Sequence, residues 1–268
     1  MFRKTLFALA LGSAAALPAL PAHAIDEDGT TLRVGALWAD ADSQLRGEGV
    51  FEGEPISFRE DFDFGGTEVA PRLDAQFRMG ERHRLLFDYF NYDKDRRWTL
   101  EEDFSYGGET VPAGSFIGGE VEFEIASLAY DFAVVETDSL SWGLQLGVEY
   151  ASIQAGARAE VGDETWSARE TSDGFAPVIG TRLTYSPANR WLFVVQGQYL
   201  DADWGNFDDY DGDLSRASAL VDYQWTDRFG VHLGYEWFRL DVDQTGSDGV
   251  LGLRQEFKGP VAGVSLRF

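Results

Sequence analysis

Residues 140–150 read LSWGLQLGVEY, and apolar residues alternate with small or polar ones at every step of this segment. One side carries Leu140, Trp142, Leu144, Leu146, Val148 and Tyr150, and the other carries Ser141, Gly143, Gln145, Gly147 and Glu149. A period of two places successive side chains on opposite faces of a β-strand. The segment therefore predicts a strand with one apolar and one polar face.

The same period recurs outward along the chain, for example in 69–79 and 229–237. Short polar links alternate with longer acidic links, the longer ones at about 42–68, 94–116, 153–173, 204–212 and 243–252. The spacing predicts ten strands, near 30–41, 69–80, 82–93, 118–135, 139–152, 174–186, 190–203, 213–225, 228–242 and 253–268. Eight or twelve strands are alternatives, because 50–64 also alternates and could form a hairpin of its own.

One predicted strand is irregular. In 118–135 the apolar row moves from Phe123 and Ile125 to Leu128 and Tyr130, so the apolar face changes near Ala126. A β-bulge, which inserts one extra residue into a strand, would produce such a change.

Composition favours an all-β protein that faces lipid. The chain has 30 Gly, 20 Phe, 10 Tyr and 8 Trp. Trp and Tyr gather near the ends of the apolar rows, whereas the opposite faces carry Gly, Gln, Arg and Asp. A transmembrane antiparallel up-and-down β-barrel has this arrangement, with an apolar band, aromatic girdles and a polar lumen. A soluble β-sandwich also alternates, but its apolar face need not be bordered by Trp and Tyr.

The N-terminal segment predicts export. Residues 1–24 have a basic start at Arg3 and Lys4, an apolar run, and an Ala22-His23-Ala24 cleavage site, which is the layout of a secretory signal peptide. The barrel domain is then expected at 25–268, in the outer membrane of a Gram-negative cell.

The last predicted strand carries the sharpest resemblance. Val264, Leu266 and Phe268 alternate with smaller or polar residues, and the sequence stops on the phenylalanine. This is similar to the C-terminal signal of bacterial outer-membrane barrels, and the layout resembles the OmpA-like and omptin-sized barrels. The resemblance implies recognition by the barrel-assembly machinery. It rests on layout and the terminal motif, so it implies no catalytic residues.

The polar faces of the predicted strands carry charges of both signs. The expected lumen residues are Arg33, Arg72, Asp74, Arg78, Arg84, Asp88, Glu149, Arg182, Arg216, Asp222, Glu236 and Arg267, with Gln196, Gln198 and His232 beside them. A ten-stranded barrel is little wider than one that its own side chains fill, and confined charges must pair. The sequence predicts a plug of structural ion pairs; an arginine-lined pathway for anions is the alternative.

Enzymatic activity is not expected. His83 and His232 follow predicted periplasmic turns, away from the outer rim where barrel enzymes place their reactive groups. GxSxG, HExxH and Walker motifs are absent from the sequence. The leading expectation is a structural or surface-interaction role. A narrow channel or transporter is the first alternative, and a loop-borne enzyme the second.

The surface is strongly acidic, with 46 Asp and Glu against 22 Lys and Arg and a net charge of −24. This balance argues against nucleic acid as a partner. The barrel assignment makes outer-membrane lipid and phosphorylated lipopolysaccharide the expected neighbours, and divalent ions could bridge the acidic links to the lipopolysaccharide. Carboxylates could collect divalent cations; weak candidates are Asp208, Asp209, Asp211 and Asp213. The expected default is a solvated acidic surface with no metal site and no cofactor.

Overall fold

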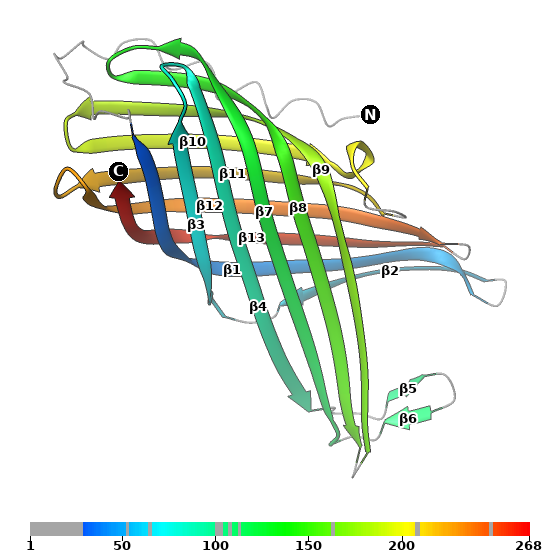
Figure 1. Cartoon of the computed structure of the whole chain (residues 1–268). Coiled ribbons are helices and arrows are strands. Elements are labelled where there is room, and N and C mark those ends of the chain that lie inside the picture. The colour runs from blue at the N-terminus through cyan, green and yellow to red at the C-terminus, as the bar shows by residue number, and fades with distance from the viewer. Residues whose placement is uncertain are drawn as a thin grey trace.

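The fold is a closed, all-antiparallel β-barrel (Figure 1). The computed structural model describes residues 29–51, 54–63, 66–99, 104–106, 109–111, 114–161, 164–206, 210–246 and 249–268. Ten strands form the wall: β1 (Thr30–Phe51), β3 (Glu68–Arg78), β4 (His83–Thr99), β7 (Phe116–Glu136), β8 (Leu140–Val161), β9 (Glu164–Ala188), β10 (Trp191–Asp201), β11 (Tyr210–Gln224), β12 (Phe229–Gly246) and β13 (Gly249–Arg267). Each wall strand pairs with the next, and β13 pairs with β1 to close the ring. The prediction of ten strands is confirmed.

Three further strands lie outside this ring. β2 (Glu54–Asp63) pairs with the outer part of β1, so the described part of 50–64 contributes to a hairpin rather than to two wall strands. β5 (Phe104–Tyr106) and β6 (Glu109–Val111) pair only with each other. A 3-10 turn, η1 (Ala202–Trp204), follows β10.

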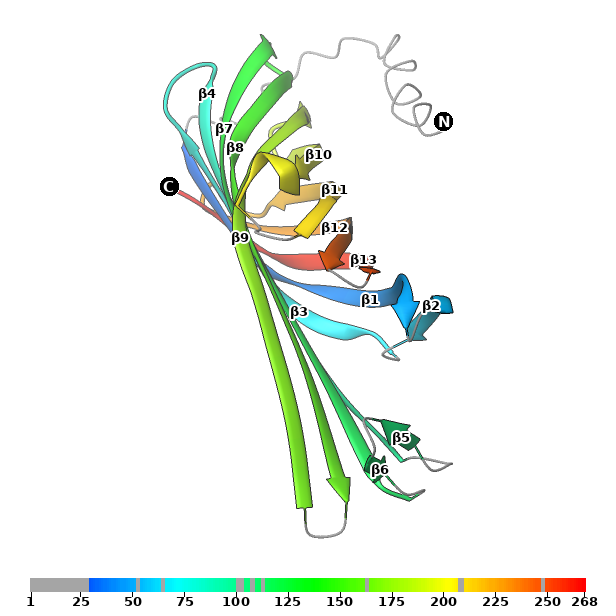
Figure 2. The same cartoon turned by 90° about the vertical axis from the view of Figure 1, so that its right-hand side faces the viewer.

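Most of the predicted outer links are strand rather than loop, which corrects the expected strand lengths. β8 and β9 pair up to Val161 and Glu164, although 153–173 was expected to be a loop. β12 and β13 likewise pair up to Gly246 and Gly249. The ladder continues because antiparallel pairing satisfies backbone groups in water as well as in lipid. In Figure 2, β4, β7, β8 and β9 run together past the other wall strands as a long ridge.

The outward face carries a belt of exposed apolar side chains. Leu146 and Leu233 are 62% and 63% exposed, and large apolar residues on neighbouring strands are exposed as well. Trp38 and Tyr235 lie toward the outer side of this belt, whereas Trp191 and Trp225 lie at its periplasmic side. A soluble monomer rarely exposes so large an apolar surface, whereas lipid tails cover such a band in a membrane barrel.

No helix in the described ranges has the length and apolar character needed to cross a membrane.

The bulge predicted near Ala126 is absent from β7. Ala126 pairs in register with Tyr89 of β4 and Tyr150 of β8, and the register shift lies instead between Ala133 and Val135. Phe123 and Ile125 point into the barrel, where they are 2% and 0% exposed. From Phe123 to Ala133 the same face of the strand points inward, and what changes is the interior, which becomes apolar at the level of Phe123 and Ile125.

Candidate functional site: the packed lumen

An ionic layer fills the barrel on the periplasmic side of its middle. Arg33 of β1 donates to Asp222 of β11 (Nε to Oδ2, 3.0 Å) and to Asp74 of β3 (2.6 Å). Asp222 also accepts from Gln224 and Ser265, each at 2.8 Å. Arg33 and Asp222 are 2% and 0% exposed. These bonds join strands from opposite ends of the chain across the lumen.

A second group of ion pairs centres on Asp88 of β4. Arg72 donates to Asp88 (Nη2 to Oδ2, 2.8 Å) and to Glu236 of β12 (Nε to Oε2, 2.8 Å). Arg216 of β11 donates to the other oxygen of Asp88 at 2.7 Å and to Glu149 of β8 at 3.2 Å. One carboxylate thus holds two guanidinium groups, the arrangement that planar arginine side chains favour.

The periplasmic end of the lumen has its own ion pairs. Arg84 donates to Glu136 at 2.9 Å and lies 3.5 Å from Asp131. Arg78 donates to the carbonyls of Gly80 and Glu81 in the turn after β3, each at 3.0 Å. These contacts tie the first periplasmic turn to the barrel interior.

The twelve charged residues expected in the lumen all lie on inward positions of the wall strands. Asp131 and Glu136 were not among them, although both reach Arg84. With these two, seven acids balance the seven arginines of the set. The alternation of Leu128, Tyr130 and Phe132 already implies an inward Asp131, so the signal was present in the sequence.

A layer of apolar and aromatic side chains lies on the outer side of the ionic layer. Phe90 stacks on Phe238 with ring centroids 4.8 Å apart, and Phe123 stacks on Phe257 at 5.1 Å. Tyr92 contacts Phe257 at 4.6 Å. The remaining large members of this aromatic layer are Leu37, Ile125, Val178, Leu200, Leu214, Leu240 and Val261. The expected polar lumen is therefore only one part of the interior, which is apolar at this level.

Inward glycines make room for the polar side chains of the ionic layer. A Cβ built on Gly143 would lie 2.4 Å from the Asp131 carboxylate, and one on Gly180 would lie 2.7 Å from Gln145 and Gln198. His232 lies against Gly263 in the same way, at 2.7 Å. At these positions the missing Cβ leaves the space that side chains of the neighbouring strands occupy.

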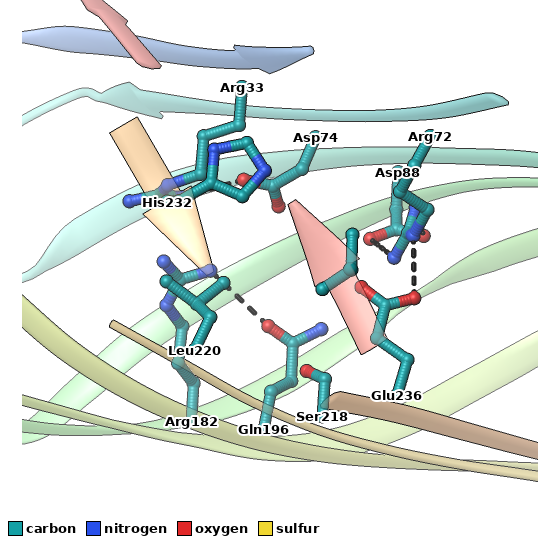
Figure 3. A pocket seen from close by; sticks show the side chains of 11 residues that line it. Arg33, Arg72, Asp74, Asp88, Arg182, Gln196, Ser218, Leu220, His232 and Glu236 are labelled. Atoms are coloured by element: carbon teal, nitrogen blue, oxygen red, sulfur yellow. Dashed lines mark hydrogen bonds and ion pairs between the residues drawn. The ribbon is translucent and has the colours of Figure 1, made fainter. Parts of the chain in front are cut away.

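A small cavity remains inside the ionic layer (Figure 3). Its volume is about 20 Å³, which suffices for about one water molecule. Arg182 and Gln196 line one side and form a hydrogen bond of 3.2 Å, while Arg33 and His232 line another. Small-molecule sites are commonly about 300–1,000 Å³, so this cavity is too small to be one.

The structure places the two histidines of the barrel domain apart and describes only part of the acidic candidate group. His83 lies on the exposed outer surface with Nδ1 2.5 Å from the Tyr130 hydroxyl, and His232 is buried in the lumen. Asp211 and Asp213 are described, whereas Asp208 and Asp209 lie outside the described residues. Within the described ranges, no group of three or more histidine or acidic residues could hold a metal ion.

No family model matches the chain, and no curated protein matches it in sequence. Among solved structures it is similar to the outer membrane protease OmpT from Escherichia coli, with a TM-score of 0.60 and 11% identity over 90% of this chain and 97% of that one. The translocator domain of the autotransporter NalP from Neisseria meningitidis gives a TM-score of 0.44 and 14% identity over 91% of each chain. OprG from Pseudomonas aeruginosa gives 0.37 and 12%, over 92% of this chain and 98% of that one. Only the similarity to OmpT has a TM-score above 0.5, and at 11% identity it shows the fold alone.

The ring closure, the apolar belt and the likeness to a solved barrel define the class of protein. This chain is a small barrel of the Gram-negative outer-membrane type, and its predicted location in the outer membrane agrees with that fold.

Proposed function

We propose that the protein is a closed outer-membrane barrel that serves as a scaffold for surface interactions rather than as a pore. The supporting observation is the stacking of two packed layers, ionic and aromatic, across one lumen. An ion crossing it would have to break buried, mutually paired charges, each of which costs several kcal/mol to leave unpaired. It would then have to displace the aromatic layer.

Conductance tests this proposal against the alternative of a narrow channel. The refolded barrel is inserted in planar bilayers, with a general porin reconstituted in the same way as the positive control. We expect no stable conductance step for this protein. A steady step on the nanosiemens scale would refute the closed lumen.

We also propose that the barrel is not an enzyme. The two histidines of the barrel domain lie apart, one on the outer surface and one in the lumen, and neither lies at the outer rim. A peptide-cleavage assay and a lipid A profile of cells that express the barrel would test this. Turnover by the purified protein, abolished by substitution of a carboxylate at the outer rim, would contradict it.

The ends of the wall strands beyond the apolar belt supply the surface for the proposed interactions. The wall strands extend as paired ladders beyond the apolar belt and carry exposed acidic residues. As part of this proposal, lipopolysaccharide is the neighbour expected to surround the belt, and the barrel-assembly machinery the factor that reads Val264, Leu266 and Phe268.

A further inference from the structure

Arginine is the last residue of three of the four periplasmic turns. These arginines are Arg82 before β4, Arg190 before β10 and Arg228 before β12. All three are exposed, and their side chains form no hydrogen bond or ion pair with any residue that the structure describes. The lumen arginines differ, since a guanidinium such as that of Arg33 is held by two carboxylates. The three turn arginines therefore have donors available for a ligand.

Two of the turn arginines flank the periplasmic end of β11. The carbonyl of Arg190 accepts from the N–H of Gln224, the last residue of β11, at 2.8 Å. On the other side, the N–H of Trp225 donates to the carbonyl of Phe229 at 2.9 Å and closes the turn that contains Arg228. Neighbouring strands lie about 4.8 Å apart, so backbones two strands apart are separated by about 10 Å. The long side chains of Arg190 and Arg228 can therefore reach one anionic group between them.

The outward wall beside these two arginines is aromatic. Trp191, Trp225 and Phe229 are 44%, 68% and 58% exposed. Trp191 packs against Tyr223 of β11, with ring centroids 4.8 Å apart. Trp and Tyr are typical of the level at which lipid tails meet headgroups. The arginines therefore lie at the headgroup level of the periplasmic leaflet. The Arg190–Arg228 patch is defined by Arg190, Trp191, Trp225, Arg228 and Phe229.

The patch combines positive charge with an apolar surface. Asp227 lies in the same turn as Arg228, but one carboxylate against two guanidinium groups leaves the patch with a net positive charge. The chain as a whole carries −24 and repels anions at long range, so an anion held here would be held by local contacts. A phosphate would accept charge-assisted hydrogen bonds from the guanidinium groups. A soluble anion would make no use of the exposed aromatic side chains, whereas a lipid would cover them.

We propose that the Arg190–Arg228 patch binds an anionic phospholipid of the periplasmic leaflet. The phosphate lies between Arg190 and Arg228, and the acyl chains run along the outward faces of β10 to β12. A zwitterionic phospholipid has a cation on its headgroup, which the two arginines repel, so the patch favours the anionic lipid. The inference concerns the periplasmic side of the barrel and does not depend on the surface-interaction role proposed for the outer side.

Native mass spectrometry tests the lipid preference. The barrel, refolded in detergent micelles, is mixed with equal amounts of phosphatidylglycerol and phosphatidylcholine that carry the same acyl chains. We expect phosphatidylglycerol to exceed phosphatidylcholine about fivefold or more among the first bound lipids, because each arginine near the headgroups attracts anionic lipid. The excess should fall as salt is added, since salt screens exposed charges.

Matched variants test the two arginines. Arg190→Gln/Arg228→Gln should bring the ratio of the two bound lipids close to one. Arg158→Gln/Arg169→Gln removes the same charge from exposed arginines of β8 and β9 at the outer side. This control should change the ratio less than about twofold, because charge effects are screened within about 10 Å. Arg190→Lys/Arg228→Lys keeps the charge and should retain most of the preference. Circular dichroism first confirms that each variant is folded.

A phosphatidylglycerol with a photoreactive group on its headgroup locates the site. Cross-links should concentrate on peptides that contain residues 189–193 and 223–229. Equal binding of both lipids to the unchanged barrel, equal loss in the two glutamine variants, or cross-links spread evenly over the four periplasmic turns would each overturn the proposal. A conductance step in planar bilayers would refute the closed lumen and leave the lipid preference as it is, so the two failures are distinguishable.

Discussion

The guanidinium carbon of Arg72 lies 5.8 Å from the centre of the Phe238 ring, and that of Arg216 lies 5.7 Å from the same ring. Both arginines also hold Asp88. Phe238 is therefore the boundary between the ionic layer and the aromatic layer, and its π-face adds a cation–π contact to each guanidinium. Because the two layers share this boundary, a substitution in either layer should alter the packing of the other.

Replacing the shared carboxylate should destabilise the barrel strongly. Asp88→Asn leaves Arg72 and Arg216 without their common partner in a buried site, which costs about 3–5 kcal/mol. Urea titration of the barrel in lipid vesicles, followed by tryptophan fluorescence, measures the loss. Glu120→Gln, which breaks the exposed pair with Arg169, should cost no more than about 1 kcal/mol. Equal effects of the two substitutions would contradict the buried network.

Truncating the boundary ring should also cost stability. Phe238→Ala leaves a cavity beneath Phe90 and above the two arginines, and about 3–5 kcal/mol should be lost. Phe238→Leu retains most of the volume and should cost clearly less. The same urea titration compares the two. A loss below about 1 kcal/mol for the alanine variant would show that the aromatic layer is not tightly packed.

Two glycine-to-alanine substitutions should distinguish a steric clash in the lumen from the intrinsic effect of alanine on strand stability. In Gly143→Ala the new Cβ would lie 2.4 Å from the Asp131 carboxylate, which must move and weaken its contact with Arg84. The expected loss is about 1–3 kcal/mol. At Gly197 the nearest atom to a new Cβ is 3.9 Å away, so Gly197→Ala should be neutral or slightly stabilising. Thermal unfolding of both variants in detergent tests the contrast; similar shifts would contradict it.

Acid should weaken a charged cluster on the outer wall above the belt. Arg254 and Arg46 contact Asp241 at 2.6 and 2.9 Å. Burial alone would raise the pKa of Asp241, but hydrogen bonds from Arg254 and Arg46 outweigh it and lower that pKa below its ordinary value.

A carboxyl whose pKa falls on folding stabilises the protein above its unfolded pKa of about 3.9. That contribution is lost as the pH drops through the lower, folded value. Unfolding free energies measured between pH 2 and 6 should therefore decline below about pH 4. The decline should be shallower in Asp241→Asn, and identical pH profiles would refute this linkage.

The sequence by itself predicted the wall strands and their lipid-facing sides, with ten as the leading strand count and eight or twelve as alternatives. A period of two fixes which side chains share a face of a strand wherever the strand lies, so the outward row of Leu144, Leu146 and Val148 could be read directly. The inward positions of Arg33 and Asp222 followed from the same parity. The alternation does not tell which inward side chains contact one another, because these contacts depend on the register and tilt of the strands around the ring.

Only the tertiary structure decided that the lumen has two layers. Phe123 and Ile125 have the same chemical character as the lipid-facing residues, so in the sequence their inward position was mistaken for a change of face. Residues 189 positions apart, Arg33 and Asp222, become partners because the ring brings β1 and β11 within reach across the lumen. The end of the β3–β4 ladder at Arg72 and Phe90 is likewise a property of pairing, since a strand's own residues do not tell where the pairing with its neighbour ends.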